Sequence, residues 1–435
     1  MANAPLVYSL GGRGAPGLYL VASILLLLFS VGFATMSRYV ISAGGFAELI
    51  AQGLGQRAGH AAAGLALLAY ACMLTGIFGQ FSAYGSDLFN LTFGYHTIWQ
   101  ELVFIAVIAI GIFGYIDIDL SAKILGVLMA LEVLILIVFD TAVLVRSPHA
   151  DIGVTGFRLH EVFSPGMGAA LMFAFACFVG FESTTIYGEE ARDPNKTVPL
   201  ATYAAISFIG IFYTLTMWCL GIAYARADVQ KVATTDPLNF VLTANRSYVG
   251  VWATDLMQIL VVTSVFAVLL SFHNTLCRYI FALARNGFLP KILSRIHKKH
   301  SSPHVASVLL SLFTSAILLG FIAASADPIK QLFMWMVALG TLAVLVLQAL
   351  AAMAVVGFFA KRPERILWRG IVAPVLGGGG LLLVVGLAVS NFQLLSGSED
   401  GVIGLLPVLI LLAATLGLWN GHRLIGRNEA ERSLG

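Results

Sequence analysis

A glycine and a glutamate interrupt an otherwise apolar run near the middle of the chain. Residues 173–182 read FAFACFVGFE, and Ser183 follows directly. A carboxylate in hydrocarbon costs roughly 2.5–3.5 kcal/mol even on lenient insertion scales, so Glu182 should face protein or a water-filled cavity. Gly180 beside it allows the helix to break, and a broken turn frees backbone groups to bind a ligand. The pattern predicts a small-molecule site at mid-membrane depth.

A second carboxylate, Glu132, lies in the middle of another apolar run, residues 125–139. Burial favours the neutral form of a carboxyl group, so Glu132 can take up and release a proton near physiological pH. The alternative is a structural carboxylate that is hydrogen-bonded to a neighbouring helix. The sequence leaves both interpretations open.

A histidine, His273, stands in the polar stretch Ser-Phe-His-Asn-Thr at residues 271–275 of a third apolar run. This stretch gives the predicted helix a polar face. A lone histidine in a helix is more often a satisfied core residue, so a role for His273 in proton coupling is a hypothesis.

The elements that hold these residues are membrane helices. Of the 435 residues, 59% are hydrophobic and 11% are charged, whereas soluble domains carry about 25% charged residues. Runs of about 20 apolar residues predict an all-α polytopic protein. The predicted spans, about eleven, lie near residues 17–37, 60–84, 98–116, 121–145, 167–187, 200–224, 252–284, 303–323, 331–359, 371–390 and 402–420.

The distribution of charge predicts the orientation and excludes some partners. With alternating spans, the basic segments 285–303 and 361–369 and the C-terminal tail fall on one side, which should be cytoplasmic. A net charge of +3 without a basic stripe excludes nucleic acid as a partner. The four cysteines have no paired spacing, so neither a metal site nor a cofactor is indicated. The HExxH and GxSxG motifs are absent, which argues against an enzyme.

Three motifs resemble those of one family of membrane proteins. The first is Phe-Val-Gly-Phe-Glu-Ser at residues 178–183, followed by Gly-Glu-Glu-Ala-Arg-Asp-Pro at 188–194. The second begins with Phe-His-Asn at 272–274 and ends with Ala-Arg-Asn-Gly-Phe-Leu-Pro at 284–290. The third is the stretch 39–55, which contains Ser-Ala-Gly-Gly-Phe. Over essentially its whole length the chain resembles the amino acid–polyamine–organocation permeases.

This resemblance implies the leucine-transporter fold of two inverted five-helix repeats, here at residues 1–145 and 146–360, followed by two helices and a cytoplasmic tail at 361–435. It implies a multi-pass transporter of amino acids or related small amines in the cell membrane, working by symport or exchange. In some proton-coupled relatives a lysine occupies the place of Glu132, which favours the proton as coupling ion, with Glu182 and His273 as further candidates. The implied substrate-binding residues are Asn3, Ala4, Pro5, Tyr70, Phe178, Gly180, Phe181, Glu182, Ser183 and Phe272.

The chain departs from the resemblance at its beginning. Relatives have twelve helices, the first of which is also broken, and Asn3-Ala4-Pro5-Leu6 resembles the unwound segment of that helix. Its N-terminal half is therefore expected to be missing, either because the true start lies upstream or because the short form is real. Two alternative functions follow: a sensor that binds substrate without transporting it, and an inactive truncated permease.

Overall fold

The structure is a computed structural model that describes residues 2–94, 98–116, 118–148, 152–225, 228–362, 366–393 and 403–433. All regular elements in these ranges are helices. Ten of them are long: α2 (Ala15–Met36), α4 (Gln56–Phe93), α5 (Trp99–Ile116), α6 (Ile118–Arg146), α10 (Pro194–Ala223), α13 (Val251–Arg285), α14 (His304–Ala323), α15 (Met334–Ala360), α16 (Ala373–Ser390) and α18 (Val408–Ser433).

The shorter helices lie at the ends of the long ones or interrupt a span. They are α1 (Ala4–Gly11), α3 (Gly45–Leu54), α7 (Leu159–Val162), α8 (Met167–Ala176), α9 (Ser183–Ile186), α11 (Val229–Thr235) and α12 (Phe240–Tyr248). Tight turns of other helical types complete the set: η1 (Gly12–Gly14), η2 (Thr155–Phe157), η3 (Tyr187–Glu190), η4 (Lys291–Ser294), η5 (Pro328–Phe333), η6 (Leu367–Val372) and η7 (Ile403–Leu405).

Two helices, α4 and α15, form the centre of the bundle. In their most apolar stretches 72% of the residues are buried, against 11% in α18. The peripheral helices instead expose large aliphatic side chains, such as Ile108 on α5 and Leu411 on α18, which are 63% and 66% exposed. A soluble protein rarely exposes such continuous apolar surface, so these faces contact lipid. The protein is therefore a multi-pass membrane protein.

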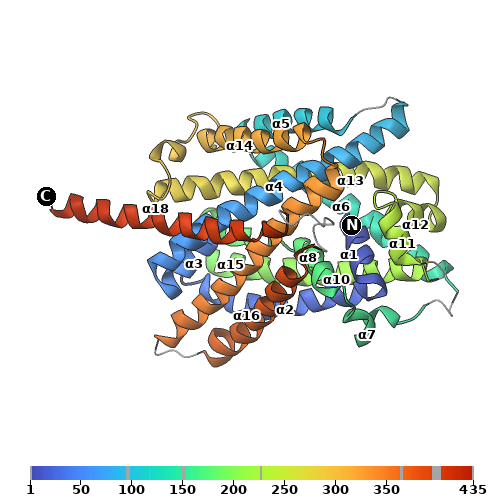
Figure 1. The fold of residues 1–435 in the computed structure, drawn as a ribbon, viewed down its shortest axis with the longest axis horizontal. Coiled ribbons are helices and arrows are strands. Elements are labelled where there is room, and N and C mark those ends of the chain that lie inside the picture. The colour runs from blue at the N-terminus through green and yellow to red at the C-terminus, as the bar shows by residue number, and fades with distance from the viewer. Residues whose placement is uncertain are drawn as a thin grey trace.

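The two ends of the bundle carry different short elements (Figure 1). We call the end with α3 the α3 end, and the end with α7, α11 and α12 the α12 end. Figure 1 shows them at opposite sides of the view, with the long helices running between them.

The predicted spans agree with the structure, apart from details at the N-terminus. In the described residues, ten segments are long and apolar enough to cross a membrane, and the first of them is Ala4–Met36. This segment combines the short helix α1 with the predicted first span, residues 17–37. It contains a reversal at η1, because Asn3 and Tyr19, on either side of the turn, both contact Cys177. The fifth predicted span, residues 167–187, is interrupted.

Candidate functional site

The interrupted span breaks where the sequence predicts. Helix α8 ends at Ala176, and α9 begins at Ser183. Between them the backbone forms short turns, in which the N–H of Phe178 bonds to Phe175 O at 2.9 Å and that of Phe181 to Phe178 O at 3.3 Å. Gly180 has φ +116°, which side chains rarely tolerate. The predicted break between residues 178 and 183 is confirmed.

Glu182 holds the broken segment in place. Its carboxylate accepts one hydrogen bond from the N–H of Gly180 at 3.0 Å and another from the Tyr70 hydroxyl of α4, also at 3.0 Å. Its side chain is almost fully buried. The hydroxyl of Ser183 donates to the freed carbonyl of Gly180 at 2.6 Å. The carboxylate thus accepts a hydrogen bond from a free N–H group of the open turn and links the turn to α4.

The beginning of α1 meets the end of α8 at this break. The amide of Asn3 donates to the Cys177 sulfur at 3.5 Å and accepts from Gln80 of α4 at 3.0 Å. At the other end of α1, Leu10 lies directly against Gly166, just before α8. The two helices therefore run antiparallel, with the N-terminal end of α1 beside the C-terminal end of α8.

A cavity of about 220 Å³ lies next to this meeting point. It is bounded by the residues just before α1 and by the broken helix, α4, α6, α10, α12, α13, η5 and α15. Most of its wall is apolar. The polar side chains on the wall are Asn3, Gln80, Tyr84, Glu132, Cys177, Tyr213 and Ser264.

The broken helix offers unused backbone acceptors at the cavity. Ala176, Cys177 and Val179 line it. Within the described residues, the carbonyl groups of Cys177 and Val179 accept no hydrogen bond, although those of Ala176, Phe178 and Gly180 do. A buried backbone carbonyl normally finds a partner, so two open carbonyls beside a cavity form a natural binding position for a cationic or N–H donor group.

Glu132 lies on the opposite wall, on α6. Its carboxyl group interacts with the hydroxyl of Ser264 on α13, and both side chains border the cavity. Asn3 borders the same cavity, as does Phe272, which follows Ser264 by two turns of α13. Glu132 therefore faces the bundle and the cavity, and not lipid.

The remaining implied substrate residues take structural positions near the cavity. Ala4 and Pro5 are buried in the first turn of α1, and Phe178 is buried among neighbouring helices. Phe181 packs against Phe29 and Phe33 of α2, with ring centroids 6.2 and 6.1 Å apart. We therefore assign these four side chains to packing around the break.

His273 points away from the cavity. Its Nε2 lies 2.9 Å from the Ser307 hydroxyl of α14, and its ring packs against Gly114 of α5. Successive residues of a helix differ in direction by about 100°, so Phe272 and His273 cannot face the same space. We leave His273 out of the proposed site.

Sequence reasoning missed several residues on the cavity wall. Gln80 carries a recognisable signal, because it is an isolated amide inside the apolar span 60–84. Cys177 and Val179 carry none, since the direction of side chains in an irregular turn does not follow helical periodicity. Tyr213 on α10 also has no distinguishing neighbours in the sequence.

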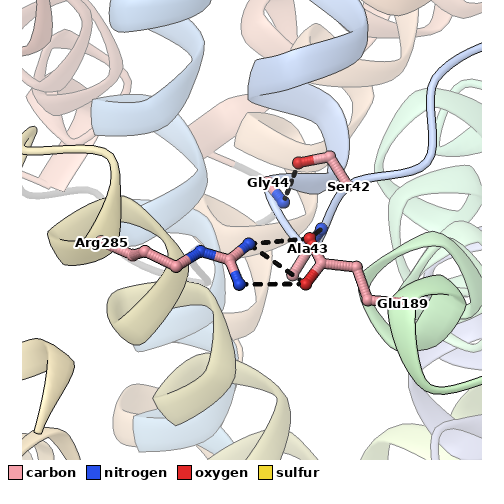
Figure 2. Close-up of polar contacts among 5 residues, drawn as sticks. All are labelled: Ser42, Ala43, Gly44, Glu189 and Arg285. Atoms are coloured by element: carbon pink, nitrogen blue, oxygen red, sulfur yellow. Dashed lines mark hydrogen bonds and ion pairs between the residues drawn. The ribbon is translucent and has the colours of Figure 1, made fainter.

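At the α3 end, an ion pair joins three segments (Figure 2). The guanidinium of Arg285, the last residue of α13, makes three contacts of 2.8–3.1 Å with the carboxylate of Glu189 in η3. The same carboxylate accepts a hydrogen bond of 2.9 Å from the N–H of Ala43, between α2 and α3. The hydrogen bonds from Arg285 and Ala43 lower the pKa of Glu189, so the pair is charged at neutral pH. This pair connects the broken helix with α13.

Comparisons with known proteins agree with this architecture. The sequence profile of the family described as amino acid permease matches residues 2–422. The branched-chain amino acid permease BcaP of Bacillus subtilis is 29% identical over 299 residues, which cover 68% of this chain and 58% of BcaP. The probable amino-acid permease meu22 of Schizosaccharomyces pombe is 26% identical over 226 residues, or 49% of this chain and 39% of meu22.

A third relative, the methylthioribose transporter of Bacillus subtilis, is 25% identical over 207 residues, or 46% of this chain and 40% of that protein. The matched part is thus less than two-thirds of the length of each of these relatives. Because the family profile covers nearly the whole sequence, the chain belongs to the amino acid permease family.

Proposed function

We propose that this protein is a secondary transporter that binds a small amino acid in the cavity beside the broken helix and carries it across the membrane by alternating access. The observation that carries the proposal is the pair of unpartnered carbonyls, Cys177 and Val179, at the edge of a cavity at a helix break. Helix breaks of this kind are how secondary transporters build substrate sites near the bilayer midplane.

The antiparallel arrangement of α1 and α8 suits a zwitterion. The N-terminal end of a helix carries a partial positive charge and its C-terminal end a partial negative charge. The substrate carboxylate would lie near the start of α1 at Asn3, and its ammonium group near the carbonyls of Cys177 and Val179. This polarity favours any α-amino acid over an amine that has no carboxylate.

The cavity wall favours a small apolar side chain. A volume of about 220 Å³ is below the roughly 300–1,000 Å³ of sites for drug-sized ligands. Beyond the polar groups around Asn3 and Glu132, the wall consists of aliphatic side chains, two methionines, Phe272 and Phe333. A relative, BcaP, is named for branched-chain amino acids. We therefore propose leucine, isoleucine and valine as the first substrates to test.

Glu132 is the proposed proton carrier. It is half-buried, borders the cavity and lies beside Ser264. A proton on its carboxyl group would therefore lie next to a substrate bound in the cavity. Glu132 would bind a proton when the site faces the more acidic side of the membrane and release it on the other side. This exchange would couple substrate uptake to the proton gradient. The alternative, in which Glu132 only supports the fold, predicts that gradient-driven uptake does not require a titratable group at position 132.

The membrane orientation belongs to the same proposal. The basic segment 285–303 and the described basic residues that follow α15, Lys361 and Arg362, lie at the α3 end. This end would face the cytoplasm together with the C-terminus, in the cell membrane. The Glu189–Arg285 pair would then close the cytoplasmic side. An exposed pair of this kind contributes only about 0–1 kcal/mol, which is suitable for a contact that must open in each cycle.

Counterflow in proteoliposomes tests the proposal. Vesicles loaded with unlabelled leucine should take up external labelled leucine faster than vesicles without protein. Stabilisation of the purified protein by leucine without counterflow would identify a sensor that binds but does not transport. If no amino acid stabilises the protein and none undergoes counterflow, the proposed substrate class is wrong.

A further inference from the structure

The segment between α13 and α14, residues 286–303, is fixed at the α3 end. Its side chains Phe288 and Leu293 are buried, with exposed fractions of 7% and 6%. The amide of Asn420 on α18 donates to the carbonyl of Phe288 at 2.6 Å. Near the other end of the segment, the Ser302 hydroxyl donates to the carbonyl of Tyr115 at 2.9 Å. The segment is thus held against the bundle at both ends.

Four cations project from this anchored segment. They are Lys291, Arg295, Lys298 and Lys299, and all four are exposed. Within the part of the chain that the structure describes, none of them forms an ion pair. We call these four residues the basic cluster.

Three other cations at the same end have partners within the chain. Arg285 pairs with Glu189, and Lys196 with Asp193. Arg362 lies over the ring of Phe358 at 4.1 Å. The basic cluster has no such partner in the described residues, so its charge is available to a partner outside the chain.

Two isoleucines alternate with these cations. Ile292 and Ile296 are 52% and 54% exposed, although buried positions exist in the same segment. Aliphatic side chains next to lysine and arginine are the composition of a membrane interface, where the apolar groups enter the acyl region and the cations meet headgroups.

The turn that carries the two lysines is shaped by a histidine. The Nδ1 atom of His297 accepts the N–H groups of Lys299 at 3.3 Å and His300 at 3.2 Å. The ring of His297 also packs against Tyr115 of α5, with centroids 5.0 Å apart. The backbone around Lys298 and Lys299 is therefore held before any partner binds.

We propose that the segment 290–299 is a docking surface for anionic phospholipids of the adjacent leaflet. The basic cluster binds the headgroup phosphates, and Ile292 and Ile296 enter the acyl region. An anionic membrane surface attracts each lysine or arginine that lies close to it, so the four cations act together. The inference requires only that the protein spans a membrane, and does not depend on transport.

Native mass spectrometry of the full chain tests this docking surface. The protein is released from micelles that contain equal amounts of phosphatidylglycerol and phosphatidylcholine, and the lipids that stay bound to it are counted. The variant Lys291→Gln/Arg295→Gln/Lys298→Gln/Lys299→Gln should lower the preference for retained phosphatidylglycerol at least about tenfold. The matched control is Arg158→Gln/Lys231→Gln/Arg246→Gln/Lys330→Gln, which removes four exposed cations elsewhere in the described chain. It should keep the wild-type preference.

A second variant, Ile292→Ser/Ile296→Ser, separates headgroup binding from acyl contact. It should reduce retention of both lipids while leaving the preference for phosphatidylglycerol intact. The proposal is overturned if the basic-cluster variant retains phosphatidylglycerol like the wild type, or if the control variant loses it equally. The melting temperature of each variant in phosphatidylcholine alone verifies that folding is unchanged.

Discussion

The carboxylate of Glu182 and the hydroxyl of Tyr70 lie 3.0 Å apart and fasten the broken helix to the central helix α4. The other carboxylate oxygen accepts the N–H of Gly180, whose positive φ opens the turn. The buried side chain of Glu182 therefore accepts two hydrogen bonds that hold the break in one conformation. The lining groups of the cavity, Cys177 and Val179, are held in position by this arrangement.

Removing the Tyr70 hydroxyl should destabilise the break. Tyr70→Phe leaves a buried carboxylate oxygen without its donor, which should lower the free energy of unfolding by about 1–3 kcal/mol. The matched control is Tyr279→Phe, because within the described residues the buried Tyr279 hydroxyl has no hydrogen-bond partner. Thermal unfolding in detergent measures both. Equal melting temperatures for the two variants would contradict the role given to the Tyr70–Glu182 bond.

Replacing the proposed proton carrier should separate coupling from binding. Glu132→Gln keeps the shape of the side chain and its contact with Ser264 but cannot titrate. Uptake driven by a proton gradient should be lost, while counterflow, which needs no gradient, persists. Glu101→Gln, an exposed carboxylate on α5, should behave like the wild type. Full gradient-driven accumulation by Glu132→Gln would rule out this residue as the carrier.

Enlarging the cavity should shift substrate selectivity. Phe272→Ala removes an aromatic side chain from the cavity wall and makes room for larger substrates. Because one or two methylene groups change selectivity by about 1–3 kcal/mol, the ratio of phenylalanine to valine uptake should rise at least about tenfold. Phe313→Ala, on the exposed face of α14, is the control. An unchanged ratio would show that the substrate does not contact Phe272.

The contact at the α3 end should be insensitive to pH near neutrality. Arg285 lowers the pKa of Glu189, so the stabilisation is present above the ordinary glutamate pKa and is lost as the pH falls through the lowered value. Between about pH 5 and 8 the contact should therefore not change. The pair is partly exposed, so its contribution is at most about 1 kcal/mol.

Hydrogen–deuterium exchange of residues 39–45 measures this contact, because the N–H of Ala43 bonds to Glu189. Glu189→Gln should speed exchange there by up to about fivefold, the equivalent of 1 kcal/mol. Glu48→Gln, whose carboxylate accepts a hydrogen bond from Gln52 within α3, should have no effect on Ala43. Unchanged exchange in Glu189→Gln would show that the pair does not hold the α3 end closed.

The sequence predicted the fold and the break because both have strong one-dimensional signals. Hydropathy locates the membrane helices, and a glycine next to a buried carboxylate marks Gly180–Glu182 as an interruption. The isolation of Glu132 in an apolar run also marks it as a candidate, although the sequence leaves its role open. These signals depend only on composition and spacing.

The cavity wall could not be predicted in the same way. Phe181 and Val179 lie two residues apart in an irregular turn, and only Val179 borders the cavity. Which of Phe272 and His273 faces the cavity depends on the rotation of α13 against its neighbours, which packing determines. The Glu189–Arg285 pair joins residues that are 96 positions apart, so only the folded chain shows it.

The central claim is that the cavity at the helix break carries the transported amino acid. Ala176→Trp would fill the cavity from the end of α8, whereas Ala324→Trp, at the exposed end of α14, leaves it open. Leucine counterflow in proteoliposomes is the direct measurement. With equal amounts of folded protein in the vesicles, the account predicts that Ala176→Trp shows no counterflow and that Ala324→Trp keeps it. Undiminished counterflow in Ala176→Trp would contradict the claim.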